Sequence, residues 1–179
     1  MIYPLERFKS LDTPFYYYDL ALLRNTLDTI KQIVKDKPNF VVHYAVKANA
    51  NPRILQIISQ TGFGADCVSG GEVQVAAENG FNPSQIVFAG VGKSDKEIRN
   101  ALTIGIHSFN VESIPELEAI NEIAMDMNTV ANVAFRVNPN VDAHTHAKIT
   151  TGLNENKFGI DIADVIPCLL YTSPSPRDA

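Results

Sequence analysis

The chain has 179 residues, 45% of them hydrophobic and 20% charged, with a net charge of −5 at pH 7. This composition excludes a largely disordered chain, and the acidic balance argues against a nucleic-acid partner. No apolar stretch approaches the roughly 20 residues that span a bilayer, and the first residues lack the order of a signal peptide. We therefore expect no membrane contacts. Because the two cysteines form no disulfide or zinc pattern, we also expect a cytoplasmic protein.

From residue 41 onward, short β-branched runs alternate with helical stretches at a nearly constant interval. The runs begin at residues 41, 64, 86, 108 and 133, which are 23, 22, 22 and 25 residues apart. One strand, one helix and two short loops take up this length, so the interval predicts parallel strands in repeated βα units. The amino-acid sequence itself does not repeat with this interval, which argues against a solenoid.

The expected helix boundaries carry signals of their own. Three segments place a glutamate three residues after a serine, which is the pattern of a capping box: Ser69–Glu72, Ser94–Glu97 and Ser113–Glu116. Glycines follow three of the helical stretches, where a left-handed C-cap is favoured: Gly62, Gly80 and Gly105. Caps and glycines recur in phase with the strands, which supports the βα interpretation.

Two α/β architectures fit this order of elements: an open doubly wound sheet and a (β/α)8 barrel. An open sheet that binds a dinucleotide would carry a glycine-rich first turn, but Lys47–Pro52 contains no glycine. We therefore expect a TIM-type barrel. Five to six βα units cannot close eight strands, so we predict a partial barrel over residues 36–167.

The last residues depart from the pattern. Residues 168–179 hold two Ser-Pro pairs and do not continue the alternation of strands and helices. A disordered tail is one interpretation. The segment also resembles a translated sequencing-library adapter, so we expect a non-native tail and a natural gene that continues beyond Pro167.

Lys47 is the candidate for chemistry. His43, Ala45 and Lys47 share one face of the first predicted strand, because strand side chains alternate with a period of two. Lys47 lies at the carboxyl end of that strand, where barrel enzymes place reacting groups, and the small Ala45 would leave room for a flat ring. On these grounds alone, a solvated lysine beyond a strand end is the more common case.

A family resemblance changes this balance. Tyr44-Ala45-Val46-Lys47-Ala48-Asn49 resembles the cofactor-lysine motif of the fold-type III pyridoxal-phosphate decarboxylases. Further segments resemble the same family in the same order over residues 12–167: Gly64–Glu72, Phe109–Ser113, Arg136–Pro139 and Asn156–Ile160. Within the family, Gly64–Glu72 and the stretch from Thr150 to Gly159 look most like diaminopimelate decarboxylase.

The resemblance implies roles for four residues. Lys47 would carry pyridoxal 5'-phosphate. Asp66, on the inward face of the second strand, would support the site close to that lysine. Arg136, on the inward face of the fifth strand, would lie close to the cofactor, although a neighbouring acid such as Asp66 could simply pair with it. Glu72 matches a position near the cofactor, and completing the Ser69 capping box explains it equally well.

Other polar residues have more ordinary explanations. His43 is expected to be a hydrogen-bonded core histidine below the site. His144 and His146 lack a third ligand at suitable spacing, so we expect no metal site. Residues 148–157 would form a loop close to the subunit interface of a homodimer.

The resemblance also implies a division of the chain. Residues 1–35 would hold a strand at Phe15–Asp19, contributed to a β-domain that this sequence lacks, followed by a helix. The phosphate-binding loop and most substrate contacts of the family would lie downstream. We therefore expect these 179 residues alone to bind the cofactor poorly and to be inactive.

Three functions are compatible with these motifs. The favoured one is a lyase that decarboxylates meso-diaminopimelate to lysine in amino-acid biosynthesis. Another decarboxylase of the fold, acting on carboxynorspermidine, ornithine or arginine, would differ in substrate contacts that lie downstream. A non-catalytic pyridoxal-phosphate-binding barrel protein would end soon after its eighth strand, so the gene beyond Pro167 separates it from a decarboxylase.

Overall fold

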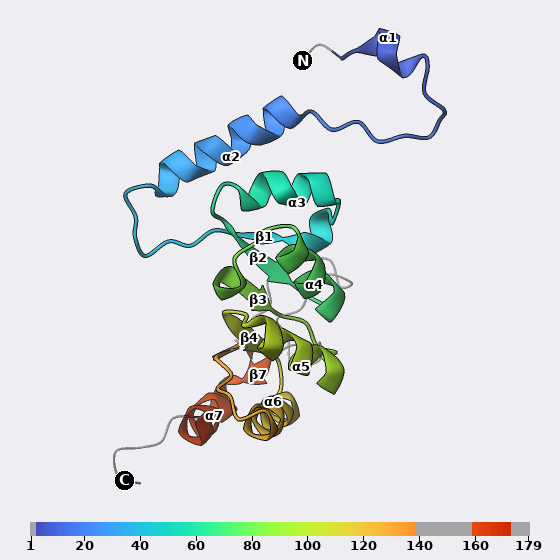
Figure 1. The fold of residues 1–179 in the computed structure, drawn as a ribbon. Helices are drawn as coiled ribbons and strands as arrows, with labels where there is room; N and C mark the ends of the chain where they lie inside the picture. The colour runs from blue at the N-terminus through green and yellow to red at the C-terminus, as the bar shows by residue number, and fades with distance from the viewer. Residues whose placement is uncertain (1–2, 139–158, 173–179) are drawn as a thin grey trace. The chain divides into compact units, whose positions relative to one another are not determined.

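The computed structural model describes residues 3–138 and 159–172, and the chain divides into two compact units, Met1–Lys37 and Pro38–Ala179 (Figure 1). The first unit holds α1 (Leu5–Phe8) and α2 (Leu20–Val34). Asp19 caps α2, because its carboxylate accepts the N–H of Leu22 at 3.0 Å.

The strand predicted at residues 15–19 is not formed in the structure. These residues carry no strand pairing, and the ring of Phe8 packs instead against the rings of Phe15 and Tyr17, with centroids 5.2 and 5.1 Å away. A strand needs a partner that satisfies its backbone N–H and C=O groups, and no described residue supplies one. That the segment joins a β-domain elsewhere remains a prediction.

The second unit is built on five parallel strands in the order β1-β2-β3-β4-β5. They are β1 (His43–Ala45), β2 (Gly64–Cys67), β3 (Ile86–Phe88), β4 (Ser108–Val111) and β5 (Val133–Phe135). The predicted interval and the parallel α/β arrangement are thus confirmed. The first strand is shorter than predicted: it begins at His43 and not at residue 41, and directly after Ala45 the chain turns into the 3-10 helix η1 (Val46–Ala48).

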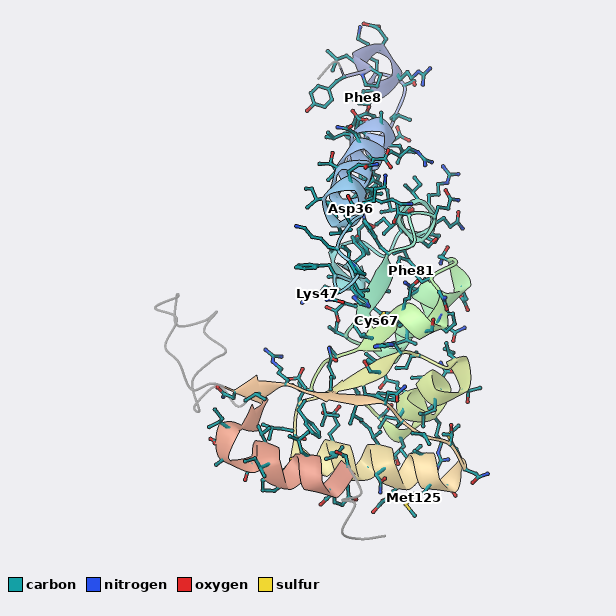
Figure 2. The ribbon with its side chains drawn as sticks, turned by 90° about the vertical axis from the view of Figure 1, so that its left-hand side faces the viewer. Phe8, Asp36, Lys47, Cys67, Phe81 and Met125 are labelled. Atoms are coloured by element: carbon teal, nitrogen blue, oxygen red, sulfur yellow. The ribbon has the colours of Figure 1, made fainter. Side chains whose placement is uncertain are left out.

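Helices connect the strands in the predicted order. They are α3 (Pro52–Ser59), α4 (Gly70–Glu78), the short η2 (Pro83–Gln85), α5 (Asp95–Ile104) and α6 (Ile114–Asp126). Figure 2 shows α4 and α5 on one side of the sheet. Alternate strand residues facing this side are almost fully buried: Ala65, Cys67, Ile86, Phe88, Phe109 and Val111. The core of the unit therefore lies between the sheet and its helices.

The three predicted capping boxes differ in detail. At Ser94 the box is complete, with Ser94 and Glu97 each accepting a backbone N–H of the other. Ser69 and Ser113 cap in the same way, but their glutamate partners accept the N–H one residue before the serine. Ser69 and Ser113 are more extended, at φ −151° and −157° against −82° for Ser94. With the serine backbone more extended, the N–H of the residue before the serine lies within hydrogen-bond distance of the glutamate carboxylate.

A second, two-stranded sheet follows β5. It consists of β6 (Val137–Asn138) and β7 (Ile160–Asp161), paired in parallel, and leads into η4 (Ile162–Asp164) and α7 (Val165–Thr172). Cys168, where the predicted non-native tail begins, is buried within α7, so the helix does not end at Pro167. The foreign origin of residues 168–179 remains a prediction. Nowhere in the described ranges is a helix both long and apolar enough to cross a membrane.

Candidate active site at the carboxyl ends of the strands

The face of the sheet opposite the helices carries the candidate site. Residues paired in a parallel sheet point to the same side, and His43 pairs with Gly64 while Ala45 pairs with Asp66. A Cβ built on Gly64 would clash with the His43 ring at 2.4 Å, which places this ring directly over Gly64. The predicted common face of the first two strands is therefore confirmed for His43, Ala45 and Asp66.

A cavity of about 370 Å³ opens at the carboxyl ends of β2 to β5. It is lined by Asp66, Ala89, Asn110, Glu112, Ala134, Phe135 and Arg136. A larger hollow of about 650 Å³ lies between α6, β5 and α7, but no charged side chain lines it. The smaller cavity is the candidate site, because it combines acidic and basic groups at the edge where parallel α/β proteins bind ligands.

Arg136 pairs with Glu112 in this cavity. Arg136 Nη1 donates to both carboxylate oxygens of Glu112, at 3.1 and 3.0 Å. The Glu112 side chain is 3% exposed and also accepts the N–H of Gly90 at 3.2 Å. The Arg136 side chain is 44% exposed, so the ion pair joins a buried carboxylate to a guanidinium at the cavity mouth.

The backbone of Arg136 is held as firmly as its side chain. Its N–H donates to the carbonyl of Val111 at 2.9 Å, and its carbonyl accepts the N–H of Ile160 at 2.7 Å. Arg136 thus lies between the two sheets, bonded to the end of β4 on one side and to β7 on the other. The sequence predicted an inward arginine here but suggested Asp66 as its acid, and the structure gives Glu112 instead.

Glu112 was not singled out from the sequence, although a signal for it exists. With a period of two, it continues the inward face of β4 one step beyond Asn110. Asn110 pairs with Ala134, so the next inward level brings Glu112 beside Arg136. The register of β4 and β5 decides this pairing, and the sequence does not contain it.

Asp66 reaches the same cavity from β2. Its side chain is half-buried, and its Oδ1 is buried with no hydrogen-bond partner among the described residues. A buried carboxylate oxygen without a donor costs about 1–3 kcal/mol or more. Such an atom marks a place where a donor from a ligand would be favourable.

Lys47 lies in η1, just after β1, with an exposed side chain. Ala45 of β1 pairs with Asp66 of β2. Lys47 follows Ala45 by two residues, so it lies just beyond the level of Asp66 toward the carboxyl end of the sheet. Figure 2 shows Lys47 on the side of the sheet away from α4 and α5. Lys47 does not itself line the cavity.

Glu72 serves as a helix cap. Its Oε2 accepts the N–H of Val68 at 2.8 Å, and it does not line the cavity. Among the four predicted site residues, the structure therefore brings Asp66 and Arg136 together, and it places Lys47 and Glu72 outside the cavity wall.

Two titratable groups report on the electrostatics below the cavity. Burial lowers the pKa of His43, and nearby His107 lowers it further, while the negative charge of Asp66 opposes both effects. Burial raises the pKa of Cys67 to about 12, with smaller contributions from Glu72 and Asp66. Cys67 is thus a neutral core thiol and no nucleophile at pH 7. The predicted loop at residues 148–157, with His144 and His146, lies outside the described residues.

Comparisons with known proteins agree with this geometry. Residues 23–175 match the family model described as the pyridoxal binding domain of pyridoxal-dependent decarboxylases. The chain is 62% identical over 164 residues to diaminopimelate decarboxylase of Bacteroides thetaiotaomicron, covering 92% of this chain and 42% of that protein.

Solved structures give the same result. The crystal structure of Helicobacter pylori diaminopimelate decarboxylase complexed with L-lysine has a TM-score of 0.85 at 40% identity and covers 96% of this chain and 43% of that one. The arginine decarboxylase of Paramecium bursaria Chlorella virus has a TM-score of 0.67 at 26% identity, covering 83% of this chain and 38% of that one. The chain thus spans about two fifths of the length of the relatives it matches. On these findings, it belongs to the family of pyridoxal-dependent decarboxylases.

Proposed function

We propose that this chain is part of a diaminopimelate decarboxylase, which releases carbon dioxide from meso-diaminopimelate and yields lysine. The observation that carries the proposal is the cavity at the carboxyl ends of the strands, where Asp66 and the Arg136–Glu112 pair meet beside the strand that leads to Lys47. Identity of 62% to a diaminopimelate decarboxylase over 92% of this chain supports this substrate. The five strands would be part of a (β/α)8 barrel, and the complete enzyme would be a cytoplasmic homodimer.

The residues present fit pyridoxal 5'-phosphate. The cofactor is a flat ring with an aldehyde and an anionic phosphate. Lys47 offers an amine that can bond to the aldehyde, and Arg136 offers a cation at the cavity mouth. Asp66 Oδ1 is a buried acceptor that needs a donor, and the small side chains of Ala89 and Ala134 leave the cavity open. Glu72 is the weakest of the proposed cofactor neighbours, since helix α4 already uses its carboxylate.

Each residue then has a defined task. When bound, the cofactor supplies an electron sink for the charge left by carbon dioxide. Lys47 would anchor it covalently at the end of β1. Glu112 holds Arg136 through its Nη1 group, which donates to both carboxylate oxygens, and this limits the positions that the guanidinium takes when Arg136 meets an anionic group. Asp66 would accept a hydrogen bond at its unsatisfied oxygen and support the anchored group from the neighbouring strand.

The test uses the complete protein in which these residues lie, reduced with borohydride in the presence of pyridoxal phosphate. We expect the cofactor mass on the peptide that contains Lys47, and its loss in Lys47→Ala. Release of carbon dioxide from meso-diaminopimelate should fall by a factor of about 10³ or more, as expected when a covalent catalyst is removed. Lys96→Ala, at an exposed position of α5, is the matched control and should behave as the unmodified protein.

Two results would contradict the proposal. Cofactor fixed to another lysine in Lys47→Ala would show that Lys47 is not the anchor. Faster decarboxylation of arginine, ornithine or carboxynorspermidine than of meso-diaminopimelate would overturn the substrate while leaving the family unchanged.

A further inference from the structure

Lys93 is a buried lysine in the loop between β3 and α5. Its side chain is 1% exposed, and its ammonium group donates to three oxygens: the carbonyls of Gly90 and Asn110, at 2.7 and 3.0 Å, and Oε1 of Glu116 at 2.5 Å. It also lies 5.3 Å from the ring centroid of Phe88. A buried ammonium is tolerated only when it is paired and fully hydrogen-bonded, and here all three of its donors have partners.

The partners of Lys93 lead to Arg136. Glu116 uses its second carboxylate oxygen to accept the backbone N–H of Glu112 at 2.9 Å. Gly90, whose carbonyl binds Lys93, donates its own N–H to the Glu112 carboxylate. Glu112 is therefore held from both ends by groups that Lys93 fixes, and its carboxylate in turn holds the guanidinium of Arg136.

Lys93 itself does not line the cavity, while Glu112 and Arg136 do. Its effect on a ligand must therefore pass through other residues. The chain of contacts runs across three successive connections, after β3, after β4 and after β5, all at the carboxyl edge of the sheet. A polar network of this kind is worth more than its separate bonds, because each member limits the positions open to the next.

We propose that Lys93 is a positioning residue that sets the orientation of Arg136 toward the cofactor. The inference rests on the proposed function, in which Arg136 lies beside the bound cofactor. Without the ammonium, the Glu116 side chain, which is 11% exposed, keeps a carboxylate with no cation beside it. That carboxylate turns toward water and releases the Glu112 N–H, and the Gly90 carbonyl loses its donor at the same time. Arg136 is then paired to a carboxylate that is no longer fixed.

The first measurement is the dissociation constant of pyridoxal phosphate in the complete protein, obtained by absorbance titration. We expect Lys93→Met to weaken binding about tenfold, the effect of one impaired hydrogen bond to a charged group. Lys96→Met removes the same charge three residues away, at an exposed position, and should leave the dissociation constant unchanged. Urea unfolding of both variants records how much stability each change costs.

The deciding measurement is a double-mutant cycle between Lys93 and Arg136. If Lys93 acts through Arg136, adding Lys93→Met to Arg136→Met weakens cofactor binding no further. Additive weakening would overturn the inference, because a residue that only stabilises the fold acts equally in both backgrounds. If Lys93→Met does not fold, Glu116→Gln breaks the same chain of contacts and enters the same cycle.

The cycle also separates this inference from the proposed function. Arg136→Met that binds the cofactor normally would refute the role given to Arg136 and, with it, the route proposed for Lys93. Arg136→Met that binds weakly, together with additivity, refutes Lys93 as a positioning residue and leaves the proposed function standing.

Discussion

Each acidic side chain around the cavity has a different supply of hydrogen-bond donors. Glu112 receives the N–H of Gly90 and the guanidinium of Arg136, and Glu116 receives the ammonium of Lys93. Asp66 has one buried oxygen with no donor in the described part of the chain. Since a buried carboxylate oxygen without a donor destabilises a fold, this oxygen of Asp66 is a place where a hydrogen-bond donor from a ligand would be favourable.

His43 makes stability depend on pH. Its pKa lies below the ordinary value of 6.5 in the folded chain, first because of burial and then because of His107, so the unfolded chain binds the proton more tightly. Stability therefore falls as the pH decreases from about 6.5 toward the lower folded pKa. When the pH is lowered from about 7.5 to about 5.5, we expect the free energy of unfolding to fall less in His43→Gln than in the unmodified protein.

The measurement is the urea unfolding midpoint of both proteins at the two pH values. An equal fall in the two midpoints would show that His43 does not contribute to the acid sensitivity.

At the residue scale, the sequence predicted which face of a strand a residue occupies better than it predicted which residues pair with each other. The period of two placed Asp66 and Arg136 on inward faces, and both line the cavity. The acid bound to Arg136 could not be predicted, because it depends on the register between β4 and β5 and on side-chain reach. A carboxylate at position 72 is expected both for a helix cap and for a contact with the cofactor, so the sequence could not separate the two roles. The structure shows that Glu72 accepts the N–H of Val68.

Most helices and strands of the second unit begin where the sequence predicted them, since local signals determine these boundaries, although β1 begins at His43 and not at residue 41. Helix α5 is the best example, with a complete capping box at Ser94 and a left-handed C-cap at Gly105, where φ is 78°. The signals at Ser69 and Ser113 predicted the helix starts correctly but not the reciprocal bond. Whether a glutamate reaches its own N-cap or the residue before it depends on the backbone angle at the serine.

Glu97 is the residue on which the start of α5 depends. It accepts the N–H and the hydroxyl of Ser94, at 3.0 and 2.7 Å, and the N–H of Gly70 at 2.7 Å. These bonds lower its pKa, with the Ser94 backbone N–H as the main cause. We expect Glu97→Gln to cost less than about 1 kcal/mol of folding free energy at neutral pH, because glutamine can keep the bond to the Ser94 N–H but loses the charge that strengthens the bonds to Ser94 and Gly70.

The loss in Glu97→Gln should also depend on pH in a defined direction. Because the folded pKa of Glu97 is below its ordinary value of 4.5, the stabilisation is complete above that value and disappears as the pH falls through the folded pKa. The difference from the unmodified protein, measured by urea unfolding, should therefore shrink in acid. Glu118→Gln, at an exposed position of α6, is the control, and an equal loss there would contradict the assignment.

At the scale of the whole molecule, the described part of the second unit is built on the five-stranded parallel sheet, with its core on the helix side. The rings of Phe88 and Phe109, each 1% exposed, lie 6.0 Å apart between the sheet and the helices. The sequence predicted the parallel order from spacing alone, because a βα unit of constant length has few alternatives. The strand at residues 15–19 could not be confirmed in the same way, since strand formation requires a partner from elsewhere.

Removal of one of these rings should affect the entire unit. We expect Phe109→Ala to cost about 3–5 kcal/mol, the usual range for a buried aromatic residue, and Phe109→Leu to cost less. Val130→Ala, at a position that is 85% exposed, should change the free energy of unfolding by less than about 0.5 kcal/mol. Similar unfolding midpoints for Phe109→Ala and Val130→Ala would refute this assignment of the core.

The bond between Glu97 and Gly70 joins two neighbouring βα units. Gly70 belongs to the first turn of α4, yet its backbone proton is held by a carboxylate from the first turn of α5. The exchange of that proton with solvent deuterium is consequently limited by motions of the following unit as well as by those of its own helix. Position 70 is therefore a native reporter, whose amide signal registers the opening of a segment more than twenty residues further along the chain.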